Sequence, residues 1–185
     1  VRIPITILVN PNPVAKDETL SECDDNRDGI SSFDLTKANS KLVSGGGYTF
    51  GYYLTFSDAQ NGVNPLANPY TNTANNQIIF ATVKDANGCI DIAEVTLHVL
   101  PIPDITFTVN HEKCFGNKDG IIFANPPFTN LEFKLNNLPW TTNSVFDSLA
   151  SGAYTVQVRD GLGCISSTPL TVNPGLRLTF SELTL

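Results

Sequence analysis

Apolar and polar residues alternate along several short segments of this chain, which is the pattern of a β-strand with one buried face. The clearest case lies at residues 153–159, where Tyr154, Val156 and Val158 fall on one face and polar residues on the other. Residues 131–135 alternate in the same way. Turn-forming residues interrupt these segments every 8 to 15 positions, and no long helical period occurs. The pattern therefore predicts an all-β protein of the sandwich type.

The longest interval between alternating segments has a mixed pattern. Residues 48–56 are rich in aromatic side chains and are predicted to form a strand. One helical turn is expected before it, at residues 36–42, and a polar turn after it, at residues 57–62.

Two alternating segments end in the same turn. Residues 83–89 (VKDANGC) and 158–164 (VRDGLGC) each run to an aspartate, turn within three residues, and reach a cysteine. Aspartate accepts hydrogen bonds from nearby main-chain N–H groups, and glycine takes a positive φ without strain. Each copy is therefore predicted to be a β-hairpin with a cysteine at the start of its returning strand.

A second motif precedes each hairpin. Residues 23–30 and 114–121 both follow the pattern Cys-x-x-Asn-x-Asp-Gly-Ile. Two different motifs that recur in the same order indicate an internal repeat. We therefore predict two tandem modules, at residues 13–101 and 102–174.

The flanking residues resemble pieces of further modules. Residues 1–12 repeat the pattern of a strand followed by proline that ends each predicted module, so they are interpreted as the last strand of a preceding module or a linker. Residues 175–185 echo the start of the second module and are interpreted as the beginning of a following module or a tail.

Charge restricts the classes of partner. The formal net charge is −7 over 185 residues, which argues against nucleic acid and against electrostatic docking on anionic membranes. No apolar run approaches the length of a transmembrane helix, so membrane insertion is not expected.

The four cysteines are placed symmetrically, one pair in each module. An even number of cysteines in small β domains favours structural disulfides and an oxidising compartment. Because the repeat places the pairs equivalently, it predicts one bridge in each module, Cys23–Cys89 and Cys114–Cys164.

The turn after Cys23 is the candidate metal site. Asp24, Asn26 and Asp28 are followed by a glycine, as in the first half of an EF-hand loop, and Asp34 lies next to the position of its last ligand. Calcium is the ion that this spacing favours. The alternative is a polar turn without metal, and the second module favours it, because Phe115 takes the place of Asp24.

Trp140 is the candidate ligand-binding residue. Its neighbours are polar turn residues, so its ring could stack on a sugar, although aromatic residues in sandwiches are more often part of the core. The sequence has two histidines and neither a Gly-x-Ser-x-Gly nor a His-Glu-x-x-His motif. The interpretation is a protein that is not an enzyme.

Residues 146–164 (FDSLASGAYTVQVRDGLGC) resemble the SprB-type repeat of Bacteroidetes cell-surface adhesins. The first module is similar to related Ig-like modules of large secreted Bacteroidetes proteins, through residues 23–29, 57–59 and 85–89. Together the resemblances cover most of residues 13–174.

The resemblance implies two tandem Ig-like β-sandwiches in a secreted protein displayed at the cell surface. It also implies secretion by the type IX system and a role as stalk or binding module in adhesion or gliding motility. The expected partners are neighbouring modules of the same chain and a surface polysaccharide or protein. The alternative is an accessory carbohydrate-binding region of a secreted multidomain enzyme.

Overall fold

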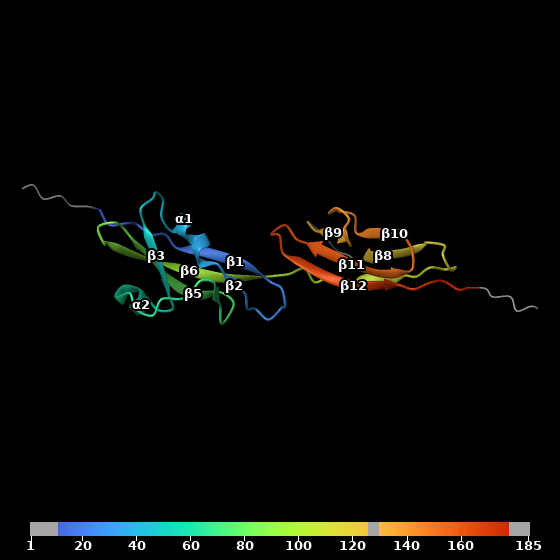
Figure 1. Cartoon of the computed structure of the whole chain (residues 1–185), viewed down its shortest axis with the longest axis horizontal. Helices are drawn as coiled ribbons and strands as arrows, with labels where there is room; N and C mark the ends of the chain where they lie inside the picture. Colours follow the sequence, from blue (N-terminus) through green and yellow to red (C-terminus); the bar gives the residue numbers. More distant parts are fainter. Residues whose placement is uncertain (1–10, 126–129, 178–185) are drawn as a thin grey trace, which may run out of the picture. The chain divides into compact units, whose positions relative to one another are not determined.

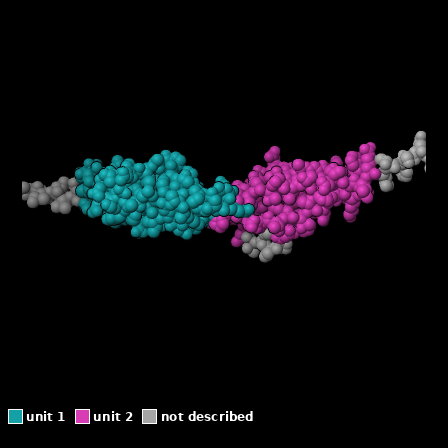
Figure 2. Space-filling model, turned by 90° about the horizontal axis from the view of Figure 1, so that it is seen from below, with its two compact units in different colours: residues 1–100 teal, residues 101–185 magenta. Residues whose placement is uncertain are grey.

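The computed structural model describes residues 11–125 and 130–177. The chain divides into two compact units, residues 1–100 (unit 1) and 101–185 (unit 2), which are described separately below (Figure 2). Strands dominate both units, so the prediction of an all-β protein is confirmed.

Unit 1 is built on one four-stranded sheet with the order β1-β6-β5-β3 (Figure 1). A two-stranded ribbon, β2-β4, forms separately from it. The elements in chain order are β1 (Glu18–Asp24), β2 (Ser32–Phe33), the 3-10 helix η1 (Leu35–Ala38), α1 (Asn39–Leu42), β3 (Thr49–Tyr53), α2 (Phe56–Asn61), β4 (Tyr70–Thr71), β5 (Gln77–Lys84) and β6 (Ile90–Pro101).

The core of unit 1 lies between the sheet and a layer made by β2, η1 and α1. Strands β5 and β6 contribute alternate residues that are fully buried, among them Ile79 and Val95. Phe33 and Leu42 meet them from the covering layer. The second layer of this sandwich is thus a short ribbon and two helical turns where a second full sheet would lie.

The helical turn predicted at residues 36–42 is confirmed by η1 and α1, whereas α2 differs from the turn predicted at 57–62. Thr55 is the N-cap of α2, since its Oγ1 accepts the Asp58 N–H at 3.0 Å, and Gly62 ends the helix at φ 65°. Phe56 packs edge-to-face on Phe80, with ring centroids 5.8 Å apart. Because Phe80 alternates with the buried residues of β5, α2 covers the sheet face opposite to the core.

Unit 2 contains two three-stranded sheets, with the orders β10-β8-β7 and β12-β11-β9 (Figure 1). Its strands are β7 (Phe107–Asn110), β8 (Gly120–Ala124), β9 (Glu132–Leu135), β10 (Val145–Leu149), β11 (Gly152–Arg159) and β12 (Ile165–Val172). Residues from both sheets form a single core, with Ile122 of β8 facing Phe133 and Val156 of the other sheet. Val156 and Val158 are buried as the alternation predicted.

Residues 1–10 and 178–185 lie outside the described residues, and with them most of both predicted flanking segments. The described part of the second flank, Gly175 to Arg177, returns to unit 2, where Leu176 forms an isolated parallel bridge with Cys114.

Candidate functional site

The two predicted hairpins exist, and their turns are closed by the same set of hydrogen bonds. Asp85 Oδ1 accepts the N–H groups of Asn87 at 2.9 Å and Cys89 at 2.8 Å. Asp160 Oδ1 accepts those of Leu162 and Cys164, both at 2.9 Å. In each turn the aspartate N–H also donates to the cysteine carbonyl, at 3.0 and 3.1 Å. The two turns that share a sequence pattern therefore also share a hydrogen-bond geometry. Each turn fixes the main chain of its cysteine.

The upstream motif of unit 1 is a turn closed by carboxylates. Asp24 accepts the Asp28 N–H on Oδ1 and the Gly29 N–H on Oδ2, each at 3.0 Å. Asn26 Nδ2 donates to Asp28 Oδ2 at 2.7 Å, and Arg27 takes a positive φ of 62°.

The upstream motif of unit 2 repeats part of this arrangement. Asn117 Nδ2 donates to Asp119 Oδ2 at 3.0 Å, and Lys118 takes a φ of 53°. The carboxylate that closes this turn is Glu112, whose oxygens accept the N–H groups of Lys118 at 2.9 Å and Gly116 at 3.4 Å.

Glu112 was not singled out from the sequence, yet its carboxyl is buried, with the residue 5% exposed. Burial raises the pKa of the Glu112 carboxyl, but donated hydrogen bonds from Lys118, Gly116 and Ser151 outweigh it and hold the pKa below its usual value. Glu112 is therefore charged in the folded protein and fixes the loop that carries Cys114. A signal was available in its position two residues before a cysteine that begins a turn.

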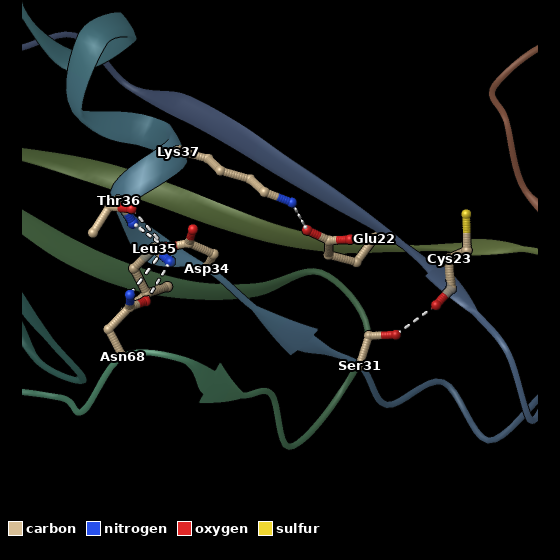
Figure 3. Close-up of polar contacts among 8 residues, drawn as sticks. All are labelled: Glu22, Cys23, Ser31, Asp34, Leu35, Thr36, Lys37 and Asn68. Carbon is tan, nitrogen blue, oxygen red and sulfur yellow. Dashed lines mark hydrogen bonds and ion pairs between the residues drawn. The ribbon is translucent and has the colours of Figure 1, made fainter.

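Asp24, Asn26 and Asp28 lie together in one turn, whereas Asp34, the fourth predicted calcium ligand, has a different role. Its Oδ1 accepts the Thr36 N–H at 3.1 Å and the Asn68 amide at 2.9 Å, so it caps η1 (Figure 3). Hydrogen bonds from Thr36 and Asn68 hold the pKa of the Asp34 carboxyl below its usual value.

Within the described residues, no group of three or more His, Cys, Asp or Glu side chains is arranged to hold a metal ion. Calcium binding at the first turn stays a prediction. A calcium-dependent rise in melting temperature that Asp28→Ala abolishes would test it.

Cys23 lies at the end of β1, on a main chain fixed from two sides. Its carbonyl accepts the Ser31 hydroxyl at 2.6 Å, and the preceding Glu22 forms an ion pair with Lys37 of η1 at 2.6 Å (Figure 3). The sulfur of Cys23 points away from these contacts (Figure 3).

The predicted bridges inside each module are not formed. Cys23 and Cys164 are disulfide-bonded, whereas Cys89 and Cys114 are free thiols. The prediction of Cys23–Cys89 and Cys114–Cys164 pairs, with one disulfide in each module, is therefore wrong. The reason is that the two cysteines of each unit lie at opposite ends of its last strand.

In unit 1, Cys89 stands at the start of β6 and Cys23 near its end. Cys23 contacts Ser31, which donates its N–H to Asn72 at 2.7 Å, and the nearby Asn75 is bonded to both main-chain groups of Val99. Val99 follows Cys89 by ten residues, which is about 30 Å along a strand. A disulfide needs Cα atoms about 4.4–6.8 Å apart, so Cys23 and Cys89 are beyond each other's reach.

In unit 2, Cys164 stands at the start of β12, and Cys114 lies beyond its end. Phe115 N–H donates to the Leu176 carbonyl at 3.2 Å, and Leu176 N–H donates to the Lys113 carbonyl at 3.3 Å. The eight residues of β12, about 25 Å of strand, separate this loop from the hairpin (Figure 1). Each unit therefore carries a hairpin cysteine at one end and an exit cysteine, beside the segment that leaves the last strand, at the other.

Trp140, the predicted ligand-binding residue, lies against charged side chains of the β9–β11 sheet. The Arg159 guanidinium carbon is 4.5 Å from the centroid of the Trp140 ring, and Lys134 Nζ is 5.7 Å from it. Arg159 also pairs with Glu132, with Nε to Oε2 at 3.0 Å. These contacts give the ring a structural role, and sugar binding at Trp140 stays a prediction.

Residues 19–103 match a family described as "Flavobacterium inter-domain disulphide bond domain". The matched segment contains β1 through β6 and includes Cys23 and Cys89. No match was found among the curated proteins.

Among solved structures, the chain is similar to the human desmocollin-1 ectodomain, at 16% identity and a TM-score of 0.30, over 96% of this chain and 39% of that one. It is similar to murine CEACAM1b at 13% identity and a TM-score of 0.30, over 83% and 94% of the two chains. The four N-terminal Ig domains of Dscam1 isoform 9.44 match at 12% identity and a TM-score of 0.26, over 92% and 48%. Scores of this size carry no inference about function.

No helix in the described part of the chain has both the length and the apolar character needed to cross a membrane.

Proposed function

We propose that this chain is a non-catalytic part of a secreted surface protein, in which Cys23 forms a disulfide with a cysteine outside residues 19–103. The observation that carries the proposal is the state of the four cysteines. Cys23 is bonded although Cys89, the other cysteine of the matched segment, is free. The partner of Cys23 therefore lies outside that segment, as the family description has it.

Such a bond sets the route that a pulling force takes. A disulfide between the exit cysteine of one module and the hairpin cysteine of the next takes the residues between those two cysteines out of the load path. Tension along the chain then passes through a covalent bond in place of strand hydrogen bonds, which each contribute only about 1 kcal/mol. This property suits a stalk that links a cell to what it adheres to.

The disulfide also supports an extracellular location, because such bonds persist in oxidising compartments and are rare in the cytosol. The Flavobacterium family description agrees with the resemblance to Bacteroidetes surface adhesins. We infer that the chain is displayed at the cell surface and acts as stalk or binding module in adhesion or gliding.

Non-reducing peptide mapping of the purified chain tests the proposal. The expected result is one peptide pair linked through Cys23 and Cys164, together with alkylated Cys89 and Cys114. Recovery of Cys23 linked to Cys89, or of four alkylated thiols, would contradict it.

A further inference from the structure

The face of the β9–β11–β12 sheet that points away from the core of unit 2 carries polar side chains on all three strands. Phe133 and Val158 point into the core, so their neighbours Lys134 and Gln157 point outward. The strand register sets Lys134 opposite Gln157, and Gln157 Nε2 donates to Ser167 Oγ of β12 at 3.2 Å. These side chains form the outer face of unit 2.

The turn after β9 places Trp140 on this outer face. Phe133 and Thr141 exchange their main-chain N–H and C=O groups, at 2.7 and 2.9 Å, and this register sets Trp140 opposite Lys134. The Arg159 guanidinium lies over the indole ring and restricts how the ring can turn. Trp140 is nevertheless only half-buried, so part of its ring stays open to a ligand.

A shallow depression lies on the outer face around Lys134, which contacts the Trp140 ring. Its volume of about 600 Å³ falls within the range of about 300–1,000 Å³ that small-molecule sites have. All of its lining residues are polar or charged: Lys134, Asn136, Asn137, Thr155 and Gln157. The Lys134 depression therefore offers hydrogen-bonding groups beside an aromatic ring.

Only some of these polar groups are used by the fold. Asn136 Oδ1 accepts the Thr155 N–H at 2.8 Å, and Arg159 pairs with Glu132. Within the described residues, the Lys134 ammonium forms no ion pair and the side-chain amide of Asn137 forms no hydrogen bond. Lys134 is thus the positive charge that remains available to an anionic ligand.

The distribution of charge restricts the kind of anion. A formal net charge of −7 disfavours densely charged polyanions such as nucleic acids, which are held by many basic contacts. One available ammonium beside amides and an indole instead matches a ligand whose charges are separated by neutral hydroxyl groups. The negative face of the indole also attracts the C–H groups of a sugar ring.

We propose that the Lys134 depression binds a polyuronate, a polysaccharide with one carboxylate on each sugar ring. The carboxylate of one ring pairs with the Lys134 ammonium, and a neighbouring ring of the same polymer stacks on Trp140. The amides of Asn137 and Gln157 form hydrogen bonds with sugar hydroxyls. The inference rests on the proposed function, since it names the class of ligand that this surface protein binds.

Trp140 is the single tryptophan of the chain, so its fluorescence reports on the site directly. Polygalacturonate is the probe, and its methyl ester is the matched control, because the ester keeps the sugar rings and removes their charge. Titration of the full chain with polygalacturonate is expected to change the Trp140 fluorescence in a saturable way. The methyl ester, and polyglutamate as a charged polymer without sugar rings, should leave the fluorescence unchanged.

Variants of the full chain test the residues by isothermal titration calorimetry. Lys134→Gln should weaken polygalacturonate binding about fivefold, as expected for loss of a surface ion pair. Trp140→Leu should weaken it about tenfold through loss of the stacking contact. Lys113→Gln makes the same charge change at an exposed position outside the depression and should bind as the parent does. Melting temperatures show whether each variant is folded.

The inference is overturned by any of three results: no fluorescence change with polygalacturonate, an equal change with the methyl ester or polyglutamate, or equal affinity of folded Lys134→Gln and the parent. Peptide mapping of the same sample separates this failure from failure of the proposed function. If Cys23 is bonded to a cysteine outside residues 19–103 while polygalacturonate does not bind, the further inference alone fails. If Cys23 is a free thiol or is bonded to Cys89, the proposed function fails.

Discussion

Single carboxylates determine where the cysteines of this protein are held. Asp85 and Asp160 each receive two main-chain N–H groups across a hairpin turn, and Glu112 receives two in the loop of Cys114. The aspartate turns could be predicted from the sequence, because Asp and Gly at fixed offsets have well-defined turn chemistry. Glu112 was missed, because its position two residues before a cysteine that begins a turn does not by itself show that the residue is buried.

The turn aspartates should contribute equally to stability. Asp85→Ala and Asp160→Ala each remove an acceptor of two main-chain hydrogen bonds, so each should lower the free energy of unfolding by about 1–3 kcal/mol. Urea denaturation followed by circular dichroism measures this. Asp25→Ala is the matched control, because Asp25 is exposed and makes no hydrogen bond in the described part of the chain. A loss in the control as large as in the two variants would contradict the assignment.

Glu112 should make the stability of unit 2 fall at acidic pH. Its pKa is lower in the folded protein than its ordinary value of 4.5, so the stability it contributes is complete above that value. That contribution is lost as the pH falls through the folded-state pKa. Glu112→Gln should therefore lower the melting temperature at neutral pH and make it less dependent on pH below 4.5. Glu94→Gln, the same charge change at an exposed position, should leave the acid dependence unchanged.

At the scale of elements, the strands and the helical turn at residues 36–42 were predictable, whereas helix α2 was not. Alternation located the buried positions of β9 and β11, because a strand with one buried face has a period of two. Helix α2 was read as a turn since its six residues are too few for a helical period to show. Its capping residues Thr55 and Gly62 were the available signal.

The N-cap of α2 provides a test at this scale. Thr55→Ala removes the acceptor of the Asp58 N–H and should cost about 1 kcal/mol of stability. Thr55→Ser keeps a hydroxyl at the same place and should retain most of the stability. Thermal melts of the two variants beside the parent chain measure the difference. If both variants lose the same amount of stability, the side-chain hydroxyl is not the group that stabilises the start of α2.

At the scale of the whole molecule, the sequence predicted correctly that one hairpin turn occurs twice, but it assigned the cysteines to the wrong partners. The sequence shows that the cysteines of the two modules occupy equivalent positions. It does not show at which end of its module each cysteine lies. That information comes from the last strand of each unit, which separates the hairpin cysteine from the exit cysteine by about 25–30 Å. Strand length was therefore the physical fact that the spacing of cysteines in the sequence did not contain.

Stretching the full chain between its termini by single-molecule force spectroscopy tests the central claim most directly. If Cys23 and Cys164 are bonded to each other, the 140 residues between them, 24–163, bear no load in the oxidised protein. Reduction should then add about 480 Å of extensible chain, at about 3.4 Å per residue, and Cys23→Ser should show the longer extension without reductant. An equal extension in the oxidised and reduced protein would contradict the account.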